Sequence, residues 1–296
     1  MNTRIRSATA VIAFALSALS VSGDARAAPG SARELSAVYA AQEERRLEVP
    51  DAEVRRYGAL ADAALAKAGV ALAAPQYVLV ADRSAWVQAI LLLWWPGTGT
   101  WSLVGASPIS TGLPGSFDHF ETPTGVFEHS PRNPDFRAEG TLNENGIRGY
   151  GAKGMRVFDL GWQPGPKGWG DGKIMDMRLQ MHATDPDVLE QRLGTAQSKG
   201  CIRIPAALNR LLDHFGVIDA AYDEPAGAAH AWVLPADRDP VEHAGRYVIV
   251  VDSGRTERPE WSPAPYIPRV RRAVQPPPPP PPPPPGPKPP PAVPIR

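Results

Sequence analysis

The chain has 296 residues, with 31 basic residues balanced by 31 acidic ones and a hydrophobic content of 43%. This length suits one large domain or two small ones, and the hydrophobic content is enough for a packed core. The balanced charge carries no electrostatic signal of nucleic-acid binding, so we expect no nucleic-acid partner. The 35 prolines and 27 glycines exceed ordinary usage and must be concentrated in particular segments.

Residues 1–27 predict a secretory signal peptide. Arg4 and Arg6 form a charged start, residues 8–21 are an apolar run, and Ala-Arg-Ala at 25–27 is typical of a cleavage site. A membrane helix is the alternative, but this apolar run is shorter than the about twenty residues needed to cross a bilayer. No cysteine lies near the cleavage site, which argues against a lipid anchor. We expect an exported protein of the periplasm or cell wall, without a membrane span in the mature chain.

Residues 28–75 are expected to be helical. One helix is predicted from Ser31 to Arg46, and a second is predicted to begin with Asp51 as its N-cap and to end at Gly69. Two short helices bury little area alone, so we expect them to cap the domain that follows.

Residues 76–252 are expected to form the main domain. Residues 77–81, 86–95 and 101–106 are apolar runs separated by turn residues, and they predict a β-meander. Residues 129–173 are rich in glycine and proline and predict an irregular lid or substrate-binding loop. Further strands are predicted at 178–182 and 247–251, and helices at 188–193 and 205–215. The expected fold class is mainly β with a few short helices.

Residues 253–296 predict a disordered, proline-rich tail. Positions 276–285 are an unbroken run of prolines, which forms extended polyproline II rather than a packed core. Residues 266–296 hold basic side chains and no acidic one. Such a tail suits attraction to an anionic wall polymer or membrane surface, and an inert disordered tail is the alternative.

Cys201 is the only cysteine of the chain. A cysteine without a partner in an exported protein is either an intermolecular bridge or a reactive thiol, although a lone cysteine can also be a small core residue. The polar run before it places Cys201 at a loop edge, and Lys199 is expected to favour the thiolate. A zinc site built from His182, Asp185 and Cys201 is a further alternative, but no HExxH or CxxC spacing supports it. We expect no metal and no cofactor.

The surroundings of Cys201 resemble a known family. His182, a spacer of fifteen residues and the Ser-Lys-Gly-Cys-Ile-Arg run at 198–203 are similar to the signature of the YkuD-type L,D-transpeptidases. Ser-Thr-Gly at 110–112 and Thr-Pro-Thr-Gly-Val-Phe at 122–127 resemble two further motifs of that family. Two positions depart from the pattern: Lys199 stands where the family usually has His, and Ala183 where it usually has Gly.

The resemblance implies a fold and a set of roles. It implies a β-sandwich or barrel-like catalytic domain that transfers acyl groups between peptidoglycan stem peptides through a thioester, which an acceptor amine resolves. It assigns Cys201 as the nucleophile, His182 as the proton donor and acceptor, the Ala183 carbonyl as the group that orients His182, the Gly200 amide as an oxyanion donor, and Arg203, Lys199 and Ser198 as substrate contacts.

Two other functions stay open. An L,D-carboxypeptidase or another peptidoglycan hydrolase would use the same thioester with water in place of the amine. A non-catalytic protein that binds or anchors the cell wall is the second alternative, in which Lys199 marks a decayed site and the tail carries the function.

Overall fold

The computed structural model describes residues 28–266, which form a mixed α/β fold of nine strands in two sheets, three α-helices and two 3-10 helices. The expected mainly β class is supported only loosely, because helices cover the larger sheet. Within residues 28–266, no helix is long and apolar enough to cross a membrane. The predicted signal peptide and the proline run of the tail lie outside the described residues.

The larger sheet has five strands in the order β3, β2, β1, β9, β4. The first three strands form the predicted antiparallel meander, and β9 adds to β1 in parallel. The bounds are β1 Gln76–Asp82, β2 Ala89–Trp95, β3 Ser102–Pro108, β4 Gly125–Glu128 and β9 Tyr247–Val251.

The smaller sheet has four strands in the order β5, β6, β7, β8. Its bounds are β5 Phe136–Arg137, β6 Arg156–Pro166, β7 Ile174–Ala183 and β8 Ile202–Ile204. Both β5 and β6 lie entirely in the segment 129–173 that was expected to be irregular, so that expectation is wrong for these residues. β6 contains a bulge between Asp159 and Trp162, and Gly161 within it has φ 82°. The bulge interrupts the alternation of apolar and polar side chains that would identify a strand, and pairing with β7 holds the strand together.

The helices follow the predicted local signals with small shifts. Their bounds are α1 Ala32–Gln42, α2 Asp51–Ala68 and α3 Ala206–His214, with 3-10 helices η1 Glu190–Arg192 and η2 Pro225–Val233. Ser31 caps α1, and Gly69 ends α2 in the left-handed conformation at φ 68°. Pro50 occupies the N-cap position of α2, so Asp51 is its first helical residue. The helix expected at 188–193 is reduced to η1.

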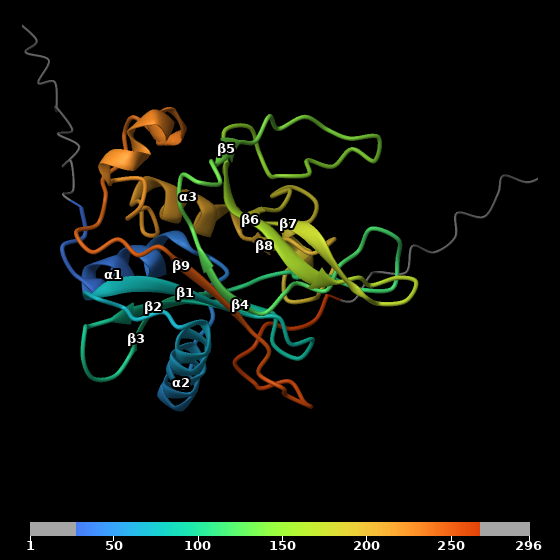
Figure 1. The fold of residues 1–296 in the computed structure, drawn as a ribbon, viewed down its shortest axis with the longest axis horizontal. Coiled ribbons are helices and arrows are strands. Elements are labelled where there is room, and N and C mark those ends of the chain that lie inside the picture. Colours follow the sequence, from blue (N-terminus) through green and yellow to red (C-terminus); the bar gives the residue numbers. More distant parts are fainter. Residues whose placement is uncertain (1–27, 267–296) are drawn as a thin grey trace, which may run out of the picture.

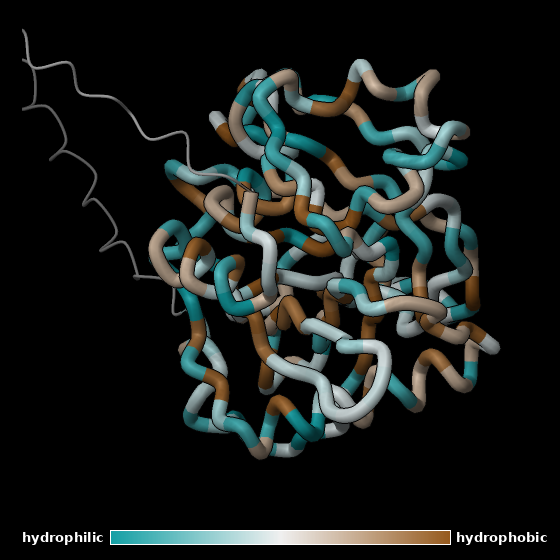
Figure 2. The backbone as a smooth tube through the Cα atoms, turned by 90° about the vertical axis from the view of Figure 1, so that its left-hand side faces the viewer, coloured by the Kyte–Doolittle hydropathy of each residue, from teal (hydrophilic) through white to brown (hydrophobic). Residues whose placement is uncertain are grey.

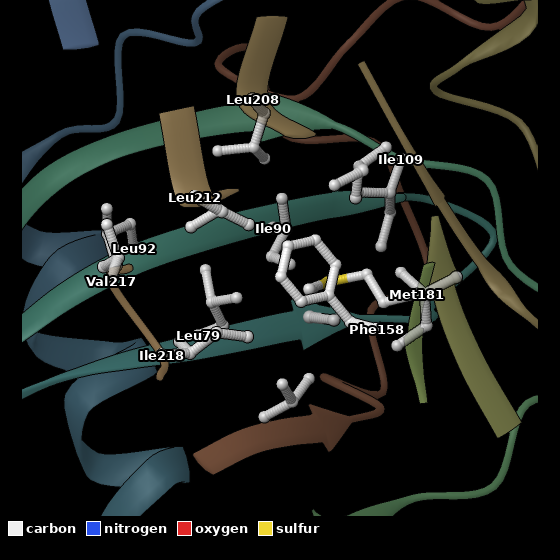
Figure 3. Packing of buried hydrophobic residues seen from close by; sticks show 14 of the residues in the cluster. Leu79, Ile90, Leu92, Ile109, Phe158, Met181, Leu208, Leu212, Val217 and Ile218 are labelled. Atoms are coloured by element: carbon white, nitrogen blue, oxygen red, sulfur yellow. The ribbon is translucent and has the colours of Figure 1, made fainter. Parts of the chain in front are cut away.

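The core lies on both faces of the five-stranded sheet. Val78 and Val80 of β1 belong to a hydrophobic cluster with α2, whereas Leu79 belongs to a second cluster with α1, α3 and the smaller sheet. Figure 1 shows α2 on one side of the larger sheet and α1 and α3 on the other. Figure 3 shows Phe158 and Met181 of the smaller sheet among the side chains of this second layer. Many hydrophobic segments accordingly lie in the middle of the molecule in Figure 2. The smaller sheet is therefore fixed to the larger one through its inner face, and its other face is left for side chains that do not pack in the core.

Residues 253–266, which were assigned to the tail, pack on the body of the protein. The indole of Trp261 meets the ring of Tyr57 on α2 edge to face, at a centroid separation of 5.8 Å. The backbone amide of Tyr266 donates to Thr195 Oγ1 at 2.9 Å. Composition alone favours disorder here, but a few aromatic and proline contacts are enough to hold the segment in place.

Candidate active site

Three segments that are far apart in sequence meet at Cys201. Ser110 and Arg203 exchange backbone hydrogen bonds of 3.0 and 2.9 Å. The Thr111 carbonyl accepts the Ser198 amide at 2.9 Å. The Ser-Thr-Gly segment at 110–112 thus runs along the edge of the loop that carries the thiol.

Thr122, from the third segment, joins the other two. Its hydroxyl accepts the Gly112 amide at 2.8 Å and donates to the Gly200 carbonyl at 2.7 Å. A Cβ atom on Gly112 would lie 2.0 Å from the Phe120 carbonyl oxygen, so no other residue fits there without a backbone shift. The glycine and the two threonines of these motifs therefore shape the loop around Cys201.

Ser198 and Gly200 are held inside that loop. The Ser198 hydroxyl accepts the Gly200 amide at 3.0 Å and donates to the Cys201 carbonyl at 2.6 Å. Ser198 is buried, so its hydroxyl shapes the turn rather than facing a substrate. Because the Gly200 amide is occupied, an oxyanion role for it requires this turn to open. Gly200 itself has φ 135°, a conformation that disfavours any side chain.

His182 and Cys201 project from the same face of the smaller sheet. In the parallel pair of β7 and β8, Met181 lies opposite Ile202 and His182 lies opposite Arg203. Met181 and Ile202 point into the core, so His182 and Arg203 point to the other face. Cys201 comes two residues before Arg203 and therefore follows on that same side. This strand pairing brings two residues that are distant in sequence to one edge of the sheet, where the partner of the thiol is the Arg178 carbonyl and that of the His182 ring nitrogen Nδ1 is the Ala183 carbonyl.

The His182 ring has one defined tautomer. Its Nδ1 lies 2.8 Å from the Ala183 carbonyl oxygen, which only accepts, so Nδ1 carries the proton and Nε2 has a free lone pair. The pKa of His182 is lowered to about 4, mainly by burial and to a smaller extent by the Arg203 cation, against the raising effect of the Ala183 bond. At neutral pH the imidazole is therefore an uncharged base.

The Cys201 thiol is also uncharged at rest. Burial raises its pKa, as does Asp159, whereas the Gln180 backbone and Arg203 act in the opposite direction. The sulfur lies 3.8 Å from the Arg178 carbonyl oxygen, a weak hydrogen bond that suits a protonated thiol.

Lys199 does not act on the thiol as expected. Its Nζ lies 2.9 Å from Asp118, and both side chains are exposed. The ion pair directs the ammonium away from the buried sulfur, so the cation that favours the thiolate is Arg203. The expected lowering of the Cys201 pKa is wrong, because burial outweighs every nearby positive charge.

Tyr150 and Gln180 are site residues that the motifs did not indicate. The Tyr150 ring meets the His182 ring edge to face at 4.7 Å, and its hydroxyl donates to Gln180 Oε1 at 3.1 Å. The Gln180 amide in turn donates to Asp159 at 3.1 Å. Tyr150 also lines a cavity of about 510 Å³ together with Phe136 and the loop that follows it. The only sequence signal for Tyr150 was its place in the glycine-rich segment 129–173.

The zinc alternative finds no support in the geometry. Asp185 accepts the Arg148 amide at 2.8 Å and the Asp187 amide at 3.0 Å, so its carboxylate is engaged in a turn. Across residues 28–266, no three or more His, Cys, Asp and Glu side chains gather as a metal site would require.

No protein-family model matches the chain, and no curated protein matches it either. The chemistry of the Cys201 site therefore has to be argued from its own residues.

Proposed function

We propose that the protein is an exported cysteine acyltransferase that acts on peptidoglycan stem peptides, with L,D-transpeptidase activity. The observation that carries the proposal is the convergence on Cys201 of three segments, each of which resembles a motif of that family. The Ser-Thr-Gly segment, Thr122 and the Cys201 loop are joined by direct hydrogen bonds. On this proposal, residues 76–252 form a catalytic domain of the L,D-transpeptidase fold, and residues 1–27 direct export.

In the first half-reaction, Cys201 Sγ attacks the carbonyl carbon between the third residue and the terminal D-Ala of a donor stem. The thiol proton passes to Nε2 of His182 as the sulfur–carbon bond forms. The carbon–nitrogen bond then breaks, and His182 returns the proton to the leaving amine of D-Ala. The product is a thioester on Cys201.

In the second half-reaction, an amine of an acceptor stem attacks the thioester carbonyl. His182 accepts the proton of the attacking amine and delivers it to the departing thiolate of Cys201. A new amide bond forms, the sulfur–carbon bond breaks, and both side chains return to their starting states. No cofactor takes part in either step.

The electrostatics of the pair support this sequence. Because both groups are neutral at rest, the proton moves only when the sulfur attacks, and His182 stays available as a base down to low pH. Arg203 favours the thiolate that forms and disfavours a lasting imidazolium. The backbone amide of Cys201 takes the oxyanion role on this proposal, because the Gly200 amide is bound to Ser198.

Acylation by a carbapenem tests the proposal. Mass spectrometry of the mature protein after incubation is expected to show a single adduct, which is absent from Cys201→Ala. A wild-type protein that stays unmodified, while iodoacetamide still labels the thiol, would overturn the proposed activity.

Transfer is separated from hydrolysis by the fate of the thioester. A donor tetrapeptide is incubated with and without a second stem peptide that carries a free amine. We expect a cross-linked dimer whose yield rises with the amine concentration. Release of tripeptide alone at every amine concentration would instead identify a carboxypeptidase.

A further inference from the structure

Two arginines meet in a small cavity beside the thiol. Arg192 comes from η1 and Arg203 from β8, and they line a cavity of about 10 Å³ together with Ser110 and Gln197. A space of this size holds one water molecule or one oxygen atom of a ligand. Arg203 is two residues from Cys201, so the Cα atoms of the residue that lines the cavity and of the residue that carries the thiol are about 7 Å apart along the strand.

Within residues 28–266, no carboxylate compensates the positive charge in this cavity, although the Arg192 guanidinium lies over the Tyr266 ring, 5.5 Å from its centroid. Among residues 28–266, neither Arg192 nor Arg203 forms an ion pair, and Arg203 makes one long hydrogen bond of 3.5 Å to the Gln197 carbonyl. The Arg192 Nε is buried without a hydrogen-bond partner in the same described region. Two like charges that are withdrawn from water repel each other, and the pKa of Arg203 is lowered by burial and, further, by Arg192. An anion in the cavity would remove this cost.

A buried hydroxyl completes the set of donors. Ser110 is 2% exposed, and its Oγ has no hydrogen-bond partner among the described residues. It lines the same cavity as the two guanidinium groups. Buried hydroxyls in proteins nearly always find a partner, so an unpaired one that faces two cations indicates an acceptor ligand.

We propose that Arg192, Arg203 and Ser110 form a carboxylate-binding subsite that receives the terminal carboxylate of the substrate next to Cys201. The identity of that carboxylate rests on the proposed function, whereas the subsite itself does not. In a peptide attacked at its last amide bond, the terminal carboxylate lies one residue, about 3.8 Å, beyond the attacked carbonyl. Guanidinium groups bind carboxylates through paired hydrogen bonds, which fixes both position and orientation.

Two alkylating reagents of nearly equal size test the subsite without any peptide. Iodoacetate carries a carboxylate and iodoacetamide does not, and both react with the same thiolate, so their rate ratio cancels changes in the thiol pKa. We expect Arg192→Gln to lower the ratio of iodoacetate to iodoacetamide rates about tenfold, and Ser110→Ala to lower it about threefold. Arg33→Gln on α1, an exposed arginine, is the matched control and is expected to leave the ratio unchanged.

A protection experiment on the unmodified protein covers the case in which a variant fails to fold. N-acetyl-D-alanine is expected to slow alkylation by iodoacetate, and N-acetyl-D-alaninamide is not. Arg192→Lys keeps a cation and is expected to retain part of the rate ratio. Equal effects of the acid and the amide, or an unchanged ratio in folded Arg192→Gln, would overturn the subsite.

The two proposals fail separately. If the acid protects the thiol but no carbapenem adduct forms, the subsite stands and the transpeptidase activity falls. If the adduct forms but the ratio of iodoacetate to iodoacetamide rates is the same in Arg192→Gln as in wild type, the activity stands and the carboxylate is bound elsewhere.

Discussion

Two buried histidines, His129 and His182, carry opposite electrostatics in the same protein. His129 Nε2 lies 2.9 Å from Asp135, and its Nδ1 lies 3.8 Å from Asp219. Burial lowers the pKa of His129, but Asp135 outweighs burial and the pKa is raised overall. His182 has no carboxylate partner, and burial lowers its pKa to about 4. Carboxylates beside a buried imidazole thus raise its pKa, whereas burial without them lowers it.

The surroundings of His129 form a closed network of charges. Arg156 is fully buried, with its Nε 2.6 Å from Asp135 and its Nη1 2.7 Å from Asp219. Its guanidinium also stacks at 4.9 Å from the Tyr222 ring centroid. Each charged group here faces at least one group of opposite charge, although Arg156 Nη2 and Asp219 Oδ1 have no hydrogen-bond partner among the described residues. Within residues 28–266, the Cys201 site instead combines an uncharged imidazole and thiol with arginines that form no ion pair.

The largest expected effect is on the acylation rate, through the uncharged pair of His182 and Cys201. His182→Ala is expected to slow carbapenem acylation by about 10² to 10⁴, the usual contribution of a positioned base. The rate is followed by mass spectrometry against His243→Ala, a matched control at an exposed histidine outside both sites. Equal rates in wild type and His182→Ala would remove the imidazole from the mechanism.

The next effect concerns the charged network. Arg156→Met leaves Asp135 and Asp219 buried without their cation, so we expect a loss of about 3 to 5 kcal/mol in the free energy of unfolding. Urea denaturation measures this loss, with Arg33→Gln expected to stay within about 0.5 kcal/mol of wild type. The alkylation rate of folded Cys201 is expected to be unchanged, and a parallel loss of thiol reactivity would show that the two regions are coupled.

Acidification is expected to change the contributions of the two histidines to folding stability in opposite directions. The folded pKa of His182 lies below its ordinary value, so the unfolded state binds more protons between about pH 6.5 and 4, and stability falls as pH falls through that window. The difference of about 2.5 pKa units corresponds to about 3 kcal/mol. We expect the stability difference between wild type and His182→Gln to change by this amount between pH 7.5 and pH 4.

His129 is expected to behave in the opposite way. Its folded pKa is raised, so its contribution is fully present below about pH 6.5 and is lost as pH rises through the folded pKa. The stabilisation that His129→Gln removes is therefore expected to be larger at pH 5.5 than at high pH, measured by the same urea titrations. The same sign of pH dependence for both variants would contradict the contrast between the two sites.

The smallest effect is expected at Lys199. Because its ammonium pairs with Asp118 at the surface, Lys199→Met is expected to leave the pH midpoint of Cys201 alkylation unchanged at low and at high salt. Arg203→Gln is the variant to compare with it, since removing that cation is expected to raise the pH midpoint of Cys201 alkylation. A shift with Lys199→Met that disappears in salt would mean that the lysine reaches the thiol after all.

The sequence by itself determined the local elements and the residues around the thiol. The meander of β1 to β3, the end of α2 at Gly69 and the strand that presents His182 follow from apolar runs, turn residues and a glycine stop, which act over a few residues. The three motif segments around Cys201 could be named in advance for the same reason, because each is short and contiguous.

Only the tertiary structure decided how those segments act on one another. It formed β6 across a bulge, packed Trp261 onto α2, directed Lys199 to Asp118, and brought Arg192 beside Arg203. Each of these depends on contacts between residues that are distant in sequence, and on burial, which sets whether a thiol, an imidazole or a guanidinium keeps its ordinary charge.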